Sequence, residues 1–143
     1  MRAPCTDYQE TSGVIYFARM LDKIRLQAGG ELPPGYFVGV ADGTHFDGRC
    51  AKFLNINYDK LVERTLQGGS DEEILEWCFA NGGRRRPEEI LVWNQFLAKR
   101  GWRDESSAEL EQTKNELGFA GRADIQTWMD LHDVDEGRPP RFS

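Results

Sequence analysis

The sequence predicts an all-α fold, a compact single-domain bundle of about six helices with one long loop rich in glycine and proline. Apolar residues recur at helical spacing, capping residues precede these segments, and glycine pairs follow several of them. Val38 to Ala41 is the single strand candidate. We expect a flexible N-terminal arm over residues 1–12, one helical domain over residues 13–136 and a C-terminal tail over residues 137–143.

The first helix is expected to begin at residue 13, after a cap at Thr11 or Ser12. Charge interrupts its apolar stripe, because Arg25 projects into the stripe and Asp22 lies at its edge one turn earlier. Unpaired buried charge costs several kcal/mol, so these two side chains pair, snorkel or line a polar pocket. The stripe comprises Val14, Phe17, Ala18, Leu21, Ile24 and Ala28.

A long segment, residues 31–44, follows a glycine pair and combines glycines and prolines with aromatic residues. Loops of this length inside a compact domain are often functional. We therefore expect this loop to act as a lid or pocket wall, with Tyr36 buried beside the first helix.

The rest of the chain carries further helix signals. Asp47 lies in the first turn of a short helix, Asn57 caps the next, and Ser70 with Glu73 forms a capping box. Pro87 suits the first turn of a later helix, whose apolar stripe contains Asn94 as a second polar intrusion. The expected helices run from 46 to 54, from 57 to 66, from 70 to 81, from 87 to about 98, from 106 or 107 to 118, and from about 122 to 132.

Composition restricts the class of protein. A chain of 143 residues with 39% apolar content can bury a sizeable single core. The net charge of -6 disfavours nucleic acid or an anionic membrane as partner, and the basic block from Arg84 to Arg86 is typical of a solvated loop. No segment approaches the roughly 20 apolar residues of a membrane span, and the N-terminus lacks the apolar core of a signal peptide. We expect a cytoplasmic protein of undetermined oligomeric state.

The cysteines and acidic clusters predict no metal centre and no cofactor. Three cysteines without metal-ligand spacing indicate neither a disulfide framework nor a zinc site. Cys50 with His45 as its base is one hypothesis for a nucleophile, and a small core residue is the favoured interpretation of Cys50. The acidic C-terminus does not match the calcium-loop spacing, and the usual nucleotide, dinucleotide, hydrolase and zinc-protease motifs are missing.

Five short patterns carry a family resemblance. They are Ala18-Arg19-x-x-Asp22-Lys23, Gly29-Gly30-x-Leu32, Gly35-Tyr36, Asp47-x-x-Cys50-x-x-Phe53-Leu54 and Asp71-x-Glu73-Ile74-Leu75-x-Trp77. Over residues 13–136 the chain resembles the bacterial family DUF5069, a domain of unknown function. The resemblance implies a helical domain and a recurring set of Arg19, Asp22 and Lys23, and it implies no particular reaction.

The polar intrusions suggest acid-base chemistry. A carboxylate in a partly dry site with a neighbour that tunes its pKa is the requirement for such chemistry, and Asp22 and Asp47 are the candidate catalytic residues. Lys23 or Arg25 would hold an anion. The candidate substrate-binding residues are Lys23, Arg25, Tyr36, Trp77, Trp93 and Asn94. The alternative is a structural ion pair between Asp22 and Arg25.

Two functions remain open at this point. One is a small cofactor-independent lyase, isomerase or hydrolase that acts on a small polar or anionic molecule. The other is a non-catalytic helical module that engages a protein partner through an exposed aromatic patch, or binds a ligand.

Overall fold

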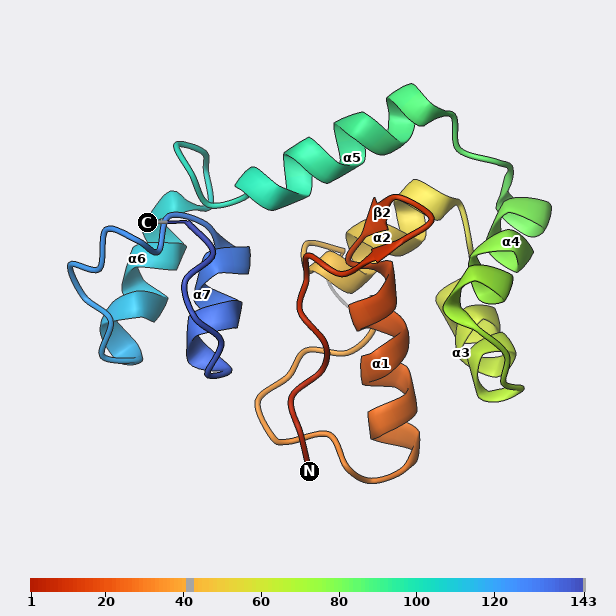
Figure 1. Ribbon diagram of the computed structural model, residues 1–143, viewed down its shortest axis with the longest axis horizontal. Helices are drawn as coiled ribbons and strands as arrows, with labels where there is room; N and C mark the ends of the chain where they lie inside the picture. Colours follow the sequence, from red (N-terminus) through yellow and green to blue (C-terminus); the bar gives the residue numbers. More distant parts are fainter. Residues whose placement is uncertain (41–42, 143) are drawn as a thin grey trace. The chain divides into compact units, whose positions relative to one another are not determined.

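The computed structural model describes residues 1–40 and 43–142, which are mostly helical (Figure 1). This described part holds two short strands, β1 (Glu10–Thr11) and β2 (Val14–Ile15), and seven helices, α1 (Phe17–Ala28), α2 (Phe46–Leu54), α3 (Tyr58–Leu66), α4 (Asp71–Gly82), α5 (Pro87–Lys99), α6 (Ser107–Glu116) and α7 (Trp128–Asp135). The predicted helical class is confirmed. The small sheet is an addition that the all-α prediction did not contain.

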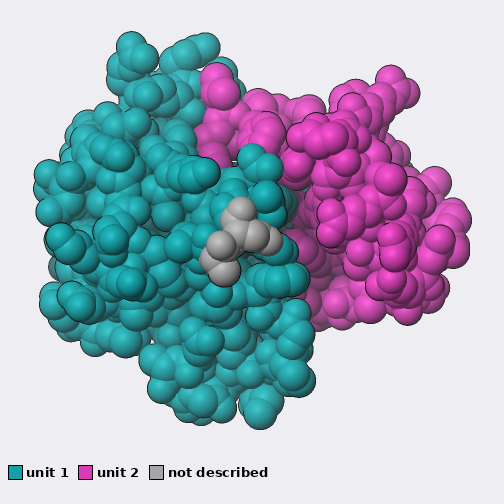
Figure 2. All heavy atoms as spheres, turned by 180° about the vertical axis from the view of Figure 1, so that it is seen from behind, with its two compact units in different colours: residues 1–91 teal, residues 92–143 magenta. Residues whose placement is uncertain are grey.

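The chain divides into two compact units, residues 1–91 and residues 92–143 (Figure 2). The first holds the sheet and α1 to α4, and the second holds α6 and α7, while α5 begins in one and continues into the other. Each unit has its own buried apolar residues, with Phe17, Leu21 and Leu75 in the first and Leu97 and Leu110 in the second. The expectation of one domain over residues 13–136 stays a prediction.

The two strands form an antiparallel hairpin in which Glu10 lies opposite Ile15 and Thr11 lies opposite Val14. The turn between them is Ser12-Gly13, and both residues have positive φ, at 47° and 84°. Two positive φ values match the twist of the flanking strands in a two-residue hairpin. The segment with the predicted helix cap at Thr11 or Ser12 is therefore a hairpin, and the strand expected at Val38 does not form over residues 38–40. Ala41 lies outside the described residues.

Helix α1 begins at Phe17, four residues later than expected, and is buried on more than one face. Burial extends beyond the predicted stripe to Met20 and Leu26 and to two cations, Arg19 and Lys23. The helix packs against α3 and β1, so it is a central helix of its unit. A single apolar stripe is the pattern of a surface helix, which buries one face only. The stripe therefore did not identify Arg19 and Lys23, which are buried on other faces of α1.

The helix caps in the first unit agree with the prediction. The Asn57 side chain accepts a hydrogen bond from the backbone N–H of Lys60 at 3.0 Å. The Ser70 hydroxyl accepts from the Glu73 N–H at 3.2 Å, and the Glu73 carboxylate accepts from the Ser70 N–H at 3.1 Å. These bonds satisfy amides that have no partner inside the helix.

The last helix begins about six residues later than predicted. Helix α7 begins at Trp128 after Thr127, whose hydroxyl accepts from the Asp130 N–H at 3.1 Å, and residues 122–127 precede the helix as a loop. The buried Lys114 of α6 holds this loop, because its ammonium donates to the carbonyls of Arg122 at 2.9 Å and Ile125 at 2.8 Å. A charged donor that bridges two carbonyls stabilises the loop without helical hydrogen bonds.

The basic block before α5 is engaged in ion pairs at the surface. Arg84 lies 2.5 Å from Glu76, while Arg85 and Arg86 lie 3.6 and 3.2 Å from Glu89. Within residues 1–40 and 43–142, none of the helices has the length and apolar character needed to cross a membrane.

Candidate functional site

The site is centred on Asp47, in the first turn of α2, where the helix dipole favours a negative charge. Its side chain is 1% exposed. The Tyr16 hydroxyl donates to Asp47 Oδ1 at 2.5 Å, and the backbone N–H of Gly39 donates to Asp47 Oδ2 at 3.0 Å. Both carboxylate oxygens are therefore engaged by donors from outside α2.

Lys23 of α1 completes a three-residue cluster with Asp47 and Tyr16, which we call the acid-base cluster. The Lys23 ammonium lies 2.9 Å from Asp47 Oδ1 and 5.5 Å from the centre of the Tyr16 ring, and it donates to the Phe37 carbonyl at 2.7 Å. Burial lowers the pKa of Lys23, and the negative charge of Asp47 opposes that shift. Burial therefore makes the Lys23 ammonium easier to deprotonate than that of an exposed lysine.

Tyr16 links the hairpin to α1 in an unusual backbone conformation. Its φ is +71°, a left-handed value that is rare for an aromatic residue and tends to occur where the surrounding structure imposes it. The side chain is fully buried. Burial, and then the charge of Asp47, raise the pKa of the Tyr16 hydroxyl well above its usual value, so Tyr16 keeps its proton.

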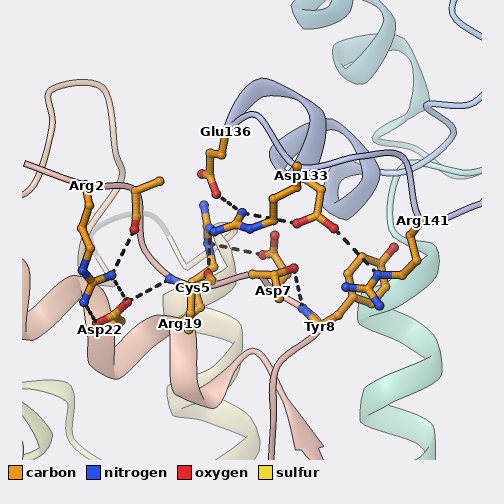
Figure 3. Close-up of polar contacts among 12 residues, drawn as sticks. Arg2, Cys5, Asp7, Tyr8, Arg19, Asp22, Asp133, Glu136 and Arg141 are labelled. Atoms are coloured by element: carbon orange, nitrogen blue, oxygen red, sulfur yellow. Dashed lines mark hydrogen bonds and ion pairs between the residues drawn. The ribbon is translucent and has the colours of Figure 1, made fainter.

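A second buried ion pair, between Arg19 and Asp7, lies next to the first along the chain (Figure 3). Arg19 Nε lies 3.6 Å from Asp7 Oδ1, and Arg19 Nη1 donates to the Cys5 carbonyl at 3.1 Å. The Asp7 carbonyl accepts from the Tyr16 N–H at 2.9 Å, which ties this pair to the acid-base cluster. In each of the two pairs a buried cation is thus compensated by a buried carboxylate, as the low dielectric of a protein interior requires.

The loop expected to cover a pocket contacts the acid-base cluster through its backbone. Phe37 and Gly39 supply the carbonyl and the N–H that bond to Lys23 and Asp47. Tyr36 lies beside α1, with the Arg19 guanidinium 5.7 Å from its ring centre, but it is only half-buried. The role of the loop as a lid stays a prediction.

Two further side chains line the same region. The Tyr58 hydroxyl is buried and has no hydrogen-bond partner within residues 1–40 and 43–142, and burial followed by the charge of Asp47 raises its pKa. Burial, and then Asp47, also raise the pKa of the fully buried Cys50 thiol. A protonated buried thiol is a poor nucleophile, which favours the interpretation of Cys50 as a core residue.

Asp22 anchors the N-terminal segment (Figure 3). Its two oxygens accept from the Arg2 guanidinium at 2.8 Å each, and the Cys5 N–H donates to the same carboxylate at 2.8 Å. Burial alone would raise the pKa of Asp22, but these hydrogen bonds outweigh it and lower the pKa. Asp22 is thus held in its charged form.

Arg25 lies 2.8 Å from Asp71 at the start of α4, and both side chains are about a third exposed. The expected pairing of Asp22 with Arg25 is replaced by these two separate pairs. Trp77 is half-buried on α4 of the first unit. Trp93 and Asn94 belong to the part of α5 that lies in the second unit, so the acid-base cluster is built without them.

Sequence reasoning identified Asp47 and Lys23 as candidates and missed Tyr16, Asp7 and Tyr58. Arg19 appeared only through the family resemblance. The signal for Tyr16 was the Ser12-Gly13 turn, because a hairpin there places Tyr16 directly before the helix. Over residues 1–40 and 43–142 no group of three or more histidine, cysteine or acidic side chains is arranged to hold a metal ion.

Comparison with known proteins gives a family but no activity. A search of curated proteins finds no match to this chain. The family model described as "Domain of unknown function (DUF5069)" matches residues 1–138. That match covers most of the sequence, including the acid-base cluster, and the chain belongs to the DUF5069 family.

Proposed function

We propose that this protein is a small cofactor-independent enzyme that transfers protons on a small polar or anionic molecule, with Asp47, Lys23 and Tyr16 as the reacting groups. The observation that carries the proposal is that Asp47 Oδ1 is shared by the Tyr16 hydroxyl and the Lys23 ammonium. A hydroxyl and an ammonium that contact the same carboxylate oxygen bring three proton-exchanging groups within hydrogen-bond distance at that oxygen.

The roles follow from charge and pKa. Asp47 accepts a proton from the substrate, Lys23 holds an anionic oxygen, and Tyr16, whose pKa is raised by burial, donates a hydrogen bond. Water is excluded because the Lys23 and Asp47 side chains are 7% and 1% exposed, and electrostatic interactions are stronger in such a site.

Asp47 is a better candidate than Asp22 for the proton acceptor. Burial raises the pKa of Asp22, but the hydrogen bonds from the Arg2 guanidinium and the Cys5 N–H outweigh it and make Asp22 a weak base, whereas Asp47 Oδ1 is bound by a hydroxyl and an ammonium. Lys23 is a better candidate than Arg25 for holding an oxygen of the substrate, because the buried Lys23 ammonium lies 2.9 Å from Asp47, whereas Arg25 pairs with Asp71 at the surface. We therefore assign proton transfer to Asp47 and a structural role to Asp22.

The test uses panels of 2-oxo acids, 2-hydroxy acids and simple amides in deuterated water, followed by proton NMR. Parent protein should exchange, eliminate or hydrolyse a member of the panel, and Asp47→Asn should slow that reaction by on the order of 10²-fold or more. Asp71→Asn is the matched carboxylate control and should leave the rate unchanged. A rate lost in Asp22→Asn and kept in Asp47→Asn would return the role to Asp22.

A non-catalytic interaction module is the second candidate, favoured by the apolar surface of α5. In the second unit Val92 is 61% exposed on this helix, and Phe96, which follows one turn later, is 43% exposed. Exposed apolar clusters of this kind mark protein-interaction sites. A panel without turnover, together with loss of self-association or partner binding in Val92→Ser, would favour this function.

We further infer that the protein works in the cytoplasm. Among the described residues Cys50 and Cys78 form no disulfide bond, and reduced thiols are typical of proteins kept in a reducing compartment. Mass spectrometry of the protein isolated from its native cells, with thiols alkylated at lysis, tests this inference.

A further inference from the structure

Two backbone groups of the loop occupy the polar atoms of the acid-base cluster. The Phe37 carbonyl accepts from Lys23 Nζ at 2.7 Å, and the Gly39 N–H donates to Asp47 Oδ2 at 3.0 Å. We call these two hydrogen bonds the loop latch. Only Val38 separates the two groups, so Lys23 and Asp47 together bind a carbonyl acceptor and an N–H donor spaced by one amino-acid residue.

The Tyr58 hydroxyl gives a second, independent observation at the same place. It is buried without a hydrogen-bond partner among the described residues, which is uncommon in folded proteins and calls for an explanation. A Cβ built on Gly39 would lie 3.7 Å from Cε1 of Tyr58, so the latch segment packs directly on this ring. A ligand in place of the latch would meet a third polar group there.

We propose that the site binds a small amide of the N-acyl amino acid amide class, and that Phe37 to Gly39 occupies the place of this ligand in the closed form. The proposal rests on the proposed function for the location of the site and adds the ligand class. Lys23 donates to the acyl carbonyl of the ligand, Asp47 accepts from its terminal amide, and Tyr58 is available for a further polar group.

The latch and the ligand then compete for the same two side chains. The apparent dissociation constant equals the intrinsic one divided by the fraction of open protein. A substitution that weakens the latch should therefore tighten ligand binding while it destabilises the loop. If the loop is purely structural, a substitution that weakens it should destabilise the loop without raising the affinity for the ligand.

Gly39→Ala is the variant that separates these cases. Gly39 has φ +99°, where an L side chain is strained. Gly68→Ala is the matched control, since Gly68 has φ +94° in the turn before α4 with open space around it. Phe37→Ala is a second, milder variant, because the exposed Phe37 ring stacks on His45 at 3.7 Å and its removal leaves the backbone intact.

The probe is N-acetyl-L-valinamide, which copies the Phe37 carbonyl, Val38 and the Gly39 N–H, titrated into the full-length protein and followed by ¹H–¹⁵N NMR. We expect shifts around Lys23, Asp47 and Tyr58, with apparent affinity raised about fivefold in Gly39→Ala and raised less in Phe37→Ala. Gly68→Ala should bind as the parent does. N-acetyl-L-valine methyl ester, which lacks the terminal N–H, should bind at least fivefold more weakly.

Each outcome is informative. Equal or weaker binding of the probe by Gly39→Ala and Phe37→Ala would overturn the proposal, as would equal binding of the amide and the ester. If Gly39→Ala does not fold, Phe37→Ala alone decides. Probe binding without turnover of any panel compound would support the ligand class and reject the enzyme, whereas turnover of an acid without probe binding would reject the ligand class alone.

Discussion

The Lys23 ammonium lies 2.9 Å from Asp47, and both side chains are more than nine-tenths buried. Removal of one partner from such a pair leaves a buried charge without compensation. We expect Lys23→Met to lower the free energy of unfolding by about 3–5 kcal/mol, measured by urea denaturation. The double variant Lys23→Met/Asp47→Asn should lose less than the sum of the single changes.

Arg25→Met is the control for this prediction, because its pair with Asp71 is about a third exposed. Exposed pairs contribute about 0–1 kcal/mol, so this change should have a small effect. Equal losses in Lys23→Met and Arg25→Met would contradict the interpretation of the Lys23–Asp47 pair as a desolvated one.

Asp22→Asn should change the acid stability of the protein. The pKa of Asp22 is lowered in the folded state from a reference value of 3.8, so its contribution to stability is present above about pH 3.8 and is lost as the pH falls through the folded pKa. The difference in melting temperature between parent and Asp22→Asn should be largest near pH 6 and shrink in acid. Arg2→Gln should reproduce this pattern, and a difference independent of pH would refute the assignment.

Leu21→Ala tests the core of the first unit. Leu21 is fully buried on α1, and truncation of a buried leucine removes apolar contacts and leaves a cavity. We expect a loss of about 2–5 kcal/mol in unfolding free energy, measured by thermal and urea denaturation. Leu66→Ala, at a leucine that is 52% exposed, should change stability by less than about 1 kcal/mol.

Lys114→Met tests the loop of the second unit. The substitution removes the Lys114 donor from the carbonyl of Ile125 and one of two donors from the carbonyl of Arg122, and a carbonyl left buried without a donor costs about 1–3 kcal/mol. Amide hydrogen exchange over residues 122–127 should accelerate at least tenfold. Lys60→Met, at an exposed lysine of α3, should leave these rates unchanged.

Helix caps were the part of the fold that local sequence predicted best. Asn57 and the Ser70–Glu73 box cap their helices as expected, because a cap involves residues three positions apart. The predicted start of α1 was wrong because it depends on contacts beyond this short range. The turn at Ser12-Gly13, with two positive φ values, belongs to a hairpin that packs against α1 and α4.

The candidate site was predicted only in part. Asp47 was identified as a carboxylate in a short helix and Lys23 as a cation able to hold an anion, but no polar intrusion marked Tyr16, since a tyrosine beside a helix start is ordinary in a sequence. Its hydroxyl becomes significant only when packing brings it to Asp47, which lies 31 residues further along the chain.

The sequence by itself determined the helical class, the caps of α3 and α4 and the presence of charge within a buried helix, because helical period and capping are short-range. The tertiary structure alone decided which charges pair. Asp22 bonds to Arg2, Arg25 to Asp71 and Lys23 to Asp47, and none of these pairs is the neighbour one helical turn away. Ion pairing in a protein interior depends on desolvation and on which distant segments packing brings together, and spacing along the chain contains neither.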